Sequence, residues 1–258
     1  MRTNVGLMES GMNQEQTQFA RWFYTGIGLL LIAICMAGFL PSMIALETRS
    51  APLPLTPMVT MHAVAAVGFL LLYVVQTLFI QKGQVGLHRV AGMIGAALAL
   101  IFVVTGWFVL VEQAHRGYDL SGSLVPRGTT AEPPVLLNAV FAFLAFGICV
   151  LLAILYRDRP NVHKRFMVLS LIGGLSGAPI LHILGFTAIL PPALNVPVFT
   201  FINLGLLSLQ PMYDKLTMGR IHPVSLWGGL AFFIGFNLWF GFLANTTVWH
   251  AFSMWVVS

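Results

Sequence analysis

Apolar residues dominate the chain in long runs, and short polar or charged segments separate these runs. A membrane-spanning helix needs about 20 predominantly apolar residues, because each residue rises about 1.5 Å and the hydrocarbon layer is about 30 Å thick. Runs of this length occur at 22–46, 58–80, 90–111, 135–156, 166–190, 191–213 and 223–244. Pro191 and Pro192 separate the fifth run from the sixth, since proline lacks the backbone donor that a helix requires. The pattern predicts an all-α fold, a polytopic membrane helical bundle with about seven transmembrane helices.

The composition agrees with this pattern. Of the 258 residues, 58% are hydrophobic and only 8% are charged, whereas soluble domains are about 25% charged. Because this small number of charged side chains cannot cover a core of this size with polar surface, a soluble globular fold is excluded. Two cysteines are too few for a disulfide-based scaffold. The lipid bilayer is therefore the first expected partner.

Basic residues gather on one side of the membrane if the seven spans alternate in direction. One side then holds Arg2, Arg21, Lys82, Arg89, Arg157, Arg159, Lys164, Arg165, Lys215 and Arg220, and the other holds Arg49, Arg116 and Arg127. Cytoplasmic loops carry the excess of Lys and Arg. We therefore predict a multi-pass membrane protein with its N-terminus on the cytoplasmic side and its C-terminus on the opposite side. The net charge of +5 then reflects topology, and no nucleic-acid partner is expected.

This topology divides the chain into three parts. Residues 1–21 form a polar cytoplasmic tail, residues 22–244 a single transmembrane domain, and residues 245–258 a tail in which Trp249 and Trp255 are typical of the membrane interface.

Two predicted helical hairpins, 58–111 and 135–190, resemble each other. His62 precedes His88 by 26 residues in the first, and Asn138 precedes His163 by 25 residues in the second. Parallel repeats of this kind indicate a repeated four-helix core with the other helices packed around it.

The histidines fall into two layers by their depth along the predicted helices. His62 and His182 share an outer layer, whereas His88 and His163 begin helices at the inner side. Ionisable side chains inside a membrane indicate function by default, and two imidazoles from different helices are the axial ligands of a low-spin b-type haem. These four histidines are therefore candidate haem-iron ligands. The neighbouring cations, Arg89, Lys164 and Arg165, are candidates for binding the haem propionates.

Two other interpretations stay open at this point. Histidines at helix starts are ordinary interfacial residues, and His62 or His182 would then only form hydrogen bonds, for example with Asn138. Copper is an alternative to haem b, because Met58, Met61 and His62 lie together and offer the soft ligands that Cu(I) prefers.

Five sequence features carry a resemblance. They are His62, His88-Arg89, His163-Lys164-Arg165-Phe166-Met167, His182, and the segment from Gly219 through Gly229 that contains His222-Pro223. On these residues the chain resembles a family of uncharacterised bacterial polytopic inner-membrane proteins, a domain of unknown function, and this likeness implies little about activity. More distantly it is similar to the transmembrane di-haem cytochrome b proteins, which implies that His88 and His163 form one ligand pair.

The second pair of those cytochromes would use His62 and the position of Asn138, which cannot ligate haem. By this resemblance either His182 takes its place or the outer haem is absent. The expected function is that of a haem-binding electron-transfer subunit that works with a quinone or another membrane protein. The alternative is a cofactor-free accessory or assembly subunit of a larger membrane complex. Enzymatic activity is left open, since a redox subunit of this kind has no independent catalytic domain.

Overall fold

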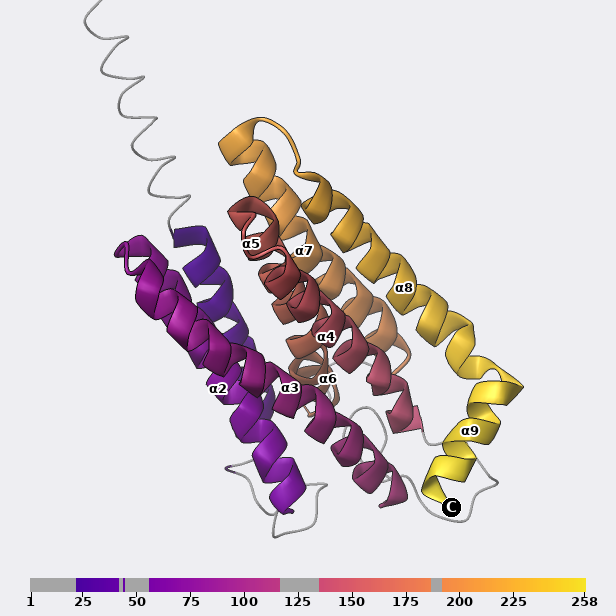
Figure 1. Ribbon diagram of the computed structural model, residues 1–258. Coiled ribbons are helices and arrows are strands. Elements are labelled where there is room, and N and C mark those ends of the chain that lie inside the picture. The colour runs from indigo at the N-terminus through magenta and orange to yellow at the C-terminus, as the bar shows by residue number, and fades with distance from the viewer. Residues whose placement is uncertain (1–21, 42–43, 45–55, 117–134, 187–191) are drawn as a thin grey trace, which may run out of the picture.

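The computed structural model describes residues 22–41, 44, 56–116, 135–186 and 192–258, and these residues form a helical bundle without a strand among them (Figure 1). Six helices in the described residues are long and apolar enough to cross a membrane. They are Trp22–Pro41, Pro57–Gln81, Val85–His115, Leu137–Leu155, Pro160–Leu184 and Val224–Asn245. The predicted all-α fold of a multi-pass membrane protein is confirmed.

The first hairpin consists of α2 (Pro57–Gln81) and α3 (Val85–His115). The Thr56 side chain caps α2 by accepting a hydrogen bond from the backbone of Val59 at 3.3 Å. Gly83 adopts a φ of 70° between the two helices, a conformation that glycine adopts without the steric cost of a Cβ. The turn is therefore encoded locally, and it holds the two helices antiparallel.

The second hairpin contains the most deeply buried span. It runs from η2 (Val135–Ala139) and α4 (Val140–Leu155) into α5 (Pro160–Ser170), the π-helical turn η3 (Leu171–Leu175) and α6 (Gly177–Phe186). Within the span Pro160–Leu184 the most apolar window is 61% buried, against 6% for the span Val224–Asn245. The helix expected at 166–190 therefore begins earlier, and it lies at the centre of the bundle.

Glycines allow this central helix to approach its neighbours closely. A Cβ at Gly174 would lie 2.3 Å from the Cβ of Phe146, and one at Gly173 would lie 2.4 Å from the ring of Phe232. Both glycines belong to η3, so the π-helical turn is the place where the central helix meets α4 and α8. The interruption of this helix thus lies at Leu171–Leu175 and precedes Pro179 of α6.

The last part of the chain comprises α7 (Pro192–Met218), η4 (Val224–Gly228), α8 (Gly229–Gly241), η5 (Leu243–Asn245) and α9 (Thr247–Val257). The sixth predicted span, 191–213, falls on α7, which runs alongside the other helices (Figure 1). By length and composition of the described residues, six of the seven predicted spans correspond to helices that are able to cross a membrane, and α7 is not among these six.

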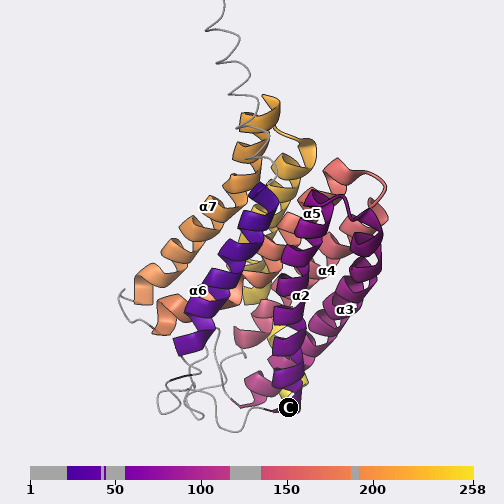
Figure 2. The same cartoon turned by 90° about the vertical axis from the view of Figure 1, so that its left-hand side faces the viewer.

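Helix Trp22–Pro41 lies between α2 on one side and α6 and α7 on the other (Figure 2). Gly28 packs against Tyr73 of α2, and Gly38 packs against the backbone of Pro179 in α6. The ring of Phe23 stacks on Tyr213 of α7 at 4.0 Å. The N-terminal helix therefore joins the first hairpin to the last part of the bundle.

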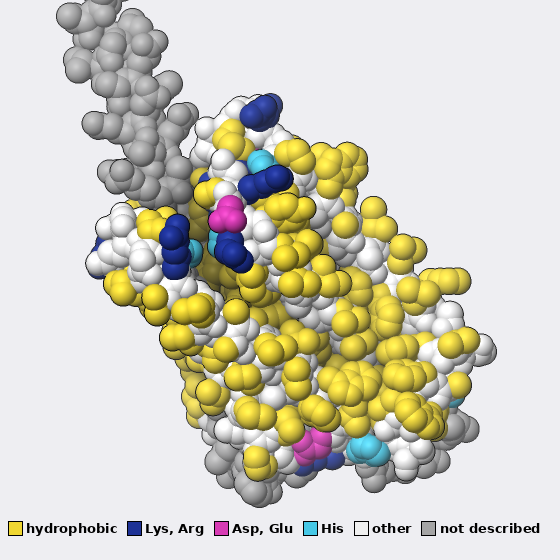
Figure 3. Space-filling model, in the orientation of Figure 1, with side chains coloured by type: hydrophobic (Ala, Val, Ile, Leu, Met, Phe, Trp, Pro, Cys, Tyr) yellow, Lys and Arg dark blue, Asp and Glu magenta, His cyan; other side chains and the backbone are white. Residues whose placement is uncertain are grey.

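The connections 82–84, 156–159 and 219–222 all lie at one end of the bundle (Figure 1), and Lys and Arg side chains gather there (Figure 3). We call this the basic end, and it carries Lys82, Arg89, Arg157, Arg159, Lys164, Arg165, Lys215 and Arg220. The opposite end carries the ion pair of Arg116 with Glu112, 2.6 Å apart, and the tail helix α9. Basic residues far apart in the sequence thus meet at one end, as the alternation of spans predicts.

Candidate functional site

His88 and His163 lie next to each other at the basic end. His88 is in the first turn of α3 and His163 in the first turn of α5. Their ring centres are 6.1 Å apart and the ring planes are nearly perpendicular, at 88°. The inner pair that the sequence predicts is therefore brought together, and we call it the histidine pair.

The ring of His163 is held by a hydrogen bond to the preceding helix. Its Nδ1 lies 2.8 Å from the backbone oxygen of Ala153. Ala153 is within the last four residues of α4, whose carbonyls have no partner inside the helix. A carbonyl only accepts, so Nδ1 carries the hydrogen and donates it. In the neutral ring this leaves the lone pair on Nε2.

His88 is held less completely. Its ring is within hydrogen-bonding reach of the backbone of Gln76 in α2, but its buried Nδ1 forms no hydrogen bond of normal geometry with the described residues. Between the tip of the α2–α3 hairpin and the tip of the α4–α5 hairpin the surface is hollowed. Histidine side chains are visible at the edge of this hollow, beside basic ones (Figure 3). The two imidazoles therefore belong to two hairpins that do not close fully against each other.

The three cations expected near the histidine pair have three different environments. Arg89 is exposed at the basic end. The Nζ of Lys164 lies 5.1 Å from the centre of the Tyr24 ring, in a cation–π contact. Arg165 is completely buried and forms an ion pair with Asp214, which is also completely buried. Arg165 is thus engaged inside the protein, whereas Arg89 faces outward.

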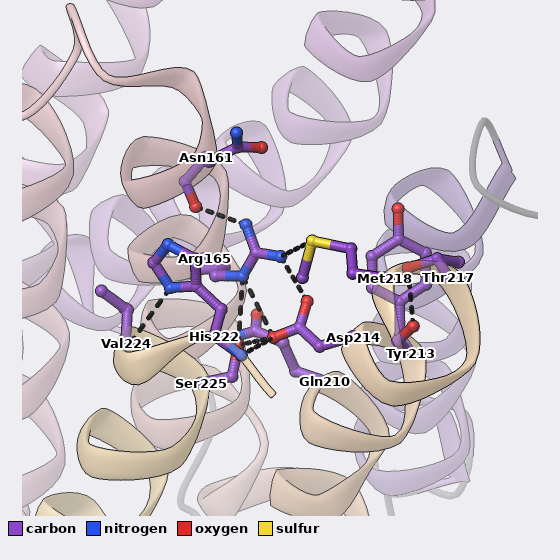
Figure 4. A network of polar contacts seen from close by, with 10 residues as sticks. All are labelled: Asn161, Arg165, Gln210, Tyr213, Asp214, Thr217, Met218, His222, Val224 and Ser225. Carbon is purple, nitrogen blue, oxygen red and sulfur yellow. Dashed lines mark hydrogen bonds and ion pairs between the residues drawn. The ribbon is translucent and has the colours of Figure 1, made fainter. Parts of the chain in front are cut away.

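Arg165 is the centre of a polar cluster that joins α5, α7 and η4 (Figure 4). Its Nη2 donates to Oδ1 of Asp214, and its Nε lies 3.2 Å from Oδ2 of the same carboxylate. Its Nη1 donates to the backbone oxygen of Asn161 at 2.5 Å, and its Nε is also 3.2 Å from the hydroxyl of Ser225. These contacts satisfy the guanidinium in a site without access to water, which is the condition for burying a charge.

The remaining members of this Arg165 cluster complete the shell of Asp214. The Ser225 hydroxyl donates to Oδ2 at 2.5 Å, and the backbone N–H of His222 donates to the same oxygen at 3.1 Å. Gln210 donates its amide to the Ser225 hydroxyl at 3.0 Å. Two of the sequence motifs, the one around Arg165 and the segment 219–229, therefore pack directly against each other.

Sequence reasoning missed Asp214, Gln210 and Ser225 as partners of Arg165. The sequence pattern indicates for Asp214 an ordinary position at the end of a span, and for Gln210 a neutral polar position within a span. The available signal was indirect: an arginine just inside a buried apolar helix needs a carboxylate, and few acidic residues lie at the same end of the bundle.

The two outer histidines lie against different aromatic side chains. The Nδ1 of His62 lies 3.2 Å from the hydroxyl of Thr105, and its ring stacks on Phe102 at 4.5 Å and meets the edge of Phe143 at 5.4 Å. The ring of His182 instead lies 4.8 Å from that of Phe39. The ring contacts observed for these two histidines are therefore with different phenylalanines.

Asn138, the counterpart of His62 in the repeat, has a structural role. Its side-chain oxygen accepts a hydrogen bond from Trp249 Nε1 at 2.6 Å, and its backbone oxygen accepts one from Trp239 Nε1 at 2.9 Å. This residue therefore fastens α8 and α9 to the start of α4. The polar groups of His62 and Asn138 are thus bonded to other partners and not to each other.

The residues expected to bind copper, and the two cysteines, have separate environments. Met61 is 46% exposed on the outer surface of α2, whereas the ring of His62 points between Phe102 and Phe143. Cys35 and Cys149 are free thiols on separate helices. No group of three or more His, Cys, Asp or Glu residues within metal-binding distance occurs in the part of the chain that the structure describes.

Comparisons with known proteins add no relative to this description. No protein family matches the chain, and neither the curated proteins nor the solved structures contain a match. The resemblances drawn from the motifs stay predictions, and the site must be interpreted from its own geometry.

Proposed function

We propose that this protein is a membrane electron-transfer protein that binds one haem b between His88 and His163. The observation that carries the proposal is the approach of the two imidazoles, whose centres are 6.1 Å apart. An imidazole nitrogen lies about 2.0–2.1 Å from a metal that it binds. Two imidazoles on opposite sides of one iron therefore have ring centres roughly 6 Å apart. Two histidines from different helices are also the ligand set of low-spin b-type haem.

The hydrogen bond from His163 to Ala153 supports the same function. Histidines that bind a metal usually donate their other ring N–H to a carbonyl or carboxylate, which fixes the tautomer and the ring orientation. At His163 this bond occupies Nδ1 and leaves Nε2 to ligate.

The surroundings also suit a flat macrocycle. The molecule is hollowed between the two hairpins (Figure 3). Gly86, close to His88, would meet no atom within 4 Å if it carried a Cβ. Exposed Arg89 is the candidate partner for a propionate, with Lys164 as a second cation, whereas the buried ion pair of Arg165 with Asp214 leaves that guanidinium no such role.

The proposal is for one haem and not two. His62 packs in an aromatic box with Thr105, and His182 packs against Phe39. The observed ring contacts of the two residues are with different phenylalanines, so they do not support the outer pair as a second ligand set.

When bound, haem supplies reversible one-electron transfer at its iron. The chain then positions the iron near the basic end through two imidazoles. Electrons must reach it from a partner at the hollow, which we propose is a quinone or another membrane protein. By the positive-inside rule we also propose that the basic end is cytoplasmic and the tail helix α9 periplasmic, in a bacterial inner membrane.

A cofactor-free accessory subunit is the competing function, and one observation favours it. The hydrogen bond from His163 satisfies an otherwise unpaired carbonyl at the end of α4, which is a sufficient structural reason for a histidine at this position. In that case His163 stabilises the hairpin and no haem is bound.

An optical spectrum separates the two functions. The protein is purified in mild detergent from haem-supplemented cells, and oxidised and dithionite-reduced spectra are recorded. We expect a Soret band and a reduced α-band in the wild type, and the loss of both in His88→Ala and His163→Ala. The matched controls, His62→Ala and His182→Ala, should keep the haem content of the wild type.

A second variant guards against loss of folding. His163→Met keeps a side chain that ligates haem, and we expect it to retain haem with a raised reduction potential, because methionine ligation raises the potential. A colourless wild type, or spectra that do not change in the His88 and His163 variants, would overturn the proposal in favour of the accessory subunit.

A further inference from the structure

Three buried polar side-chain atoms of the first hairpin are without a hydrogen-bond partner among the described residues. They are the hydroxyl oxygen of Tyr73, Oε1 of Gln76 and Nδ1 of His88. Buried polar side-chain atoms are nearly always paired, and each exception calls for an explanation. An amide oxygen is an acceptor, and an imidazole nitrogen is a donor in one of its two tautomers. Oε1 of Gln76 and Nδ1 of His88 are therefore complementary.

These two side chains come from facing positions of α2 and α3. The backbone of Gln76 is within hydrogen-bonding reach of the His88 ring. The amide nitrogen of Gln76 lies 3.6 Å from the place of a Cβ at Gly92, one turn after His88. The absence of a side chain at Gly92 thus makes room for the amide of Gln76 beside the histidine. Oxygen and nitrogen of such an amide are exchanged by a simple flip, so either can face the ring.

In the second hairpin, a histidine Nδ1 already has a hydrogen bond to the preceding helix, which is the kind of bond that Nδ1 of His88 lacks. There, Nδ1 of His163 donates to a backbone oxygen of the preceding helix, at Ala153. At His88 the backbone of Gln76, on the preceding helix, is within hydrogen-bonding reach of the ring, but Nδ1 forms no hydrogen bond of normal geometry. The side-chain amide of the same residue offers the acceptor that completes the arrangement seen at His163.

We propose that Gln76 is a positioning residue for His88. Its amide oxygen accepts the hydrogen of Nδ1, fixes the tautomer, and leaves Nε2 of His88 facing His163. The inference rests on the proposed function, because it assigns Gln76 a role toward a haem ligand. Hydrogen bonds of this kind orient the ligating ring and raise its basicity, and their loss typically lowers metal affinity about 10- to 100-fold.

The first test is made on the full-length chain without haem. The protein is labelled with ¹⁵N-histidine, placed in lipid, and examined by solid-state NMR, with His88 assigned from the signals missing in His88→Ala. We expect His88 of the wild type to be protonated on Nδ1. Gln76→Leu should turn it into a mixture of tautomers, and Gln76→Glu, which retains an acceptor, should keep the hydrogen on Nδ1.

The second test is a haem titration of the same variants. Gln76→Leu should bind haem about 10- to 100-fold more weakly than the wild type, and Gln76→Glu should restore most of the affinity. Gln81→Leu is the matched control, since it removes a glutamine from the same helix whose amide donates to Thr25 at 2.8 Å, away from His88. It should bind haem as the wild type does.

The outcomes separate the two proposals. A coloured wild type with Gln76→Leu within twofold of its haem affinity, or with His88 protonated on Nε2, overturns the role of Gln76 and leaves the proposed function standing. A colourless wild type overturns the proposed function and the positioning role together.

Discussion

Each of the two histidine layers of this bundle was predicted from the depth of two histidines along their helices, but the structure gives the two layers different surroundings. At the basic end, His88 and His163 face each other with ring centres 6.1 Å apart, and one ring is fixed by a backbone oxygen. At the opposite end, His62 is packed between two phenylalanine rings and bonded to Thr105, while His182 lies against another phenylalanine. Depth along a helix puts histidines in one layer, and only rotation about the helix axis makes them a pair.

The two ends also differ in how they hold charge. The basic end contains a fully buried ion pair, that of Arg165 and Asp214, and the opposite end contains a partly exposed one, that of Arg116 and Glu112, with each side chain 28% exposed. An unpaired buried charge is far more costly than an unpaired surface charge. The integrity of the basic end should therefore depend on its polar contacts, and that of the opposite end on apolar packing.

The largest expected effect is on stability at the basic end. Arg165→Met leaves Asp214 buried without its partner, and we expect a loss of about 3–5 kcal/mol in the free energy of unfolding. Arg116→Met removes the partly exposed partner of Glu112 and should cost about 0.2–1 kcal/mol. Thermal unfolding of both variants in the same detergent measures the difference.

A double variant checks the reason for this loss. Arg165→Met combined with Asp214→Leu removes both charges, and replacement of a buried ion pair by apolar residues is often neutral or stabilising. The double variant should therefore recover much of the stability lost in Arg165→Met. Equal losses in the Arg165 and Arg116 single variants would contradict the contrast between the two ends.

The next effect concerns packing at the opposite end. A Cβ at Gly106 would lie 2.6 Å from the ring of Phe143, which in turn meets the edge of His62. Gly106→Ala should therefore destabilise the protein by about 1–3 kcal/mol through overpacking. Its haem bands should be those of the wild type, because the histidine pair lies at the other end.

Gly95→Ala is the matched control on the same helix. A Cβ there would meet Leu72 at 3.5 Å, an ordinary contact, and alanine is the better helix former by about 0.8–1.0 kcal/mol. We expect unchanged or higher stability. A loss of haem in Gly106→Ala without a loss of stability would show that the two layers are coupled, contrary to the proposal of one haem.

Much of the architecture follows from the sequence, because runs of about 20 apolar residues, the glycine at position 83 and the alternation of charge are local signals. The shared depth of His88 and His163 also followed, since both begin helices on one side, but the rotation that makes their rings face each other did not. The Arg165 cluster did not, because Arg165 and Asp214 are 49 residues apart and meet only through the lateral packing of α5 on α7. The interruption of the central helix at Leu171–Leu175 likewise depends on close contact with Phe146 and Phe232.

The smallest expected effect is a pH dependence at the basic end. Partial burial, with the guanidinium of Arg165 nearby, holds the pKa of His222 below its usual range, although Asp214 acts in the opposite direction. As the pH falls, the unfolded chain therefore binds the proton before the folded protein does, and stability decreases. The contribution is fully present above the unfolded pKa of about 6.5 and is lost as the pH falls through the lower folded value.

The hydrogen bonding of His222 also indicates that stability decreases as the pH falls, and a single substitution isolates the contribution of this residue. The Nδ1 of His222 accepts a hydrogen bond from the backbone of Val224 at 3.1 Å, which requires this nitrogen to be unprotonated. His222→Asn keeps an acceptor suited to a helix start but does not titrate. Unfolding midpoints measured between about pH 7.5 and about pH 5 should fall less steeply in His222→Asn than in the wild type. Equal slopes would assign the acid sensitivity to other groups, and the polar cluster at the basic end would then have no titratable member in this range.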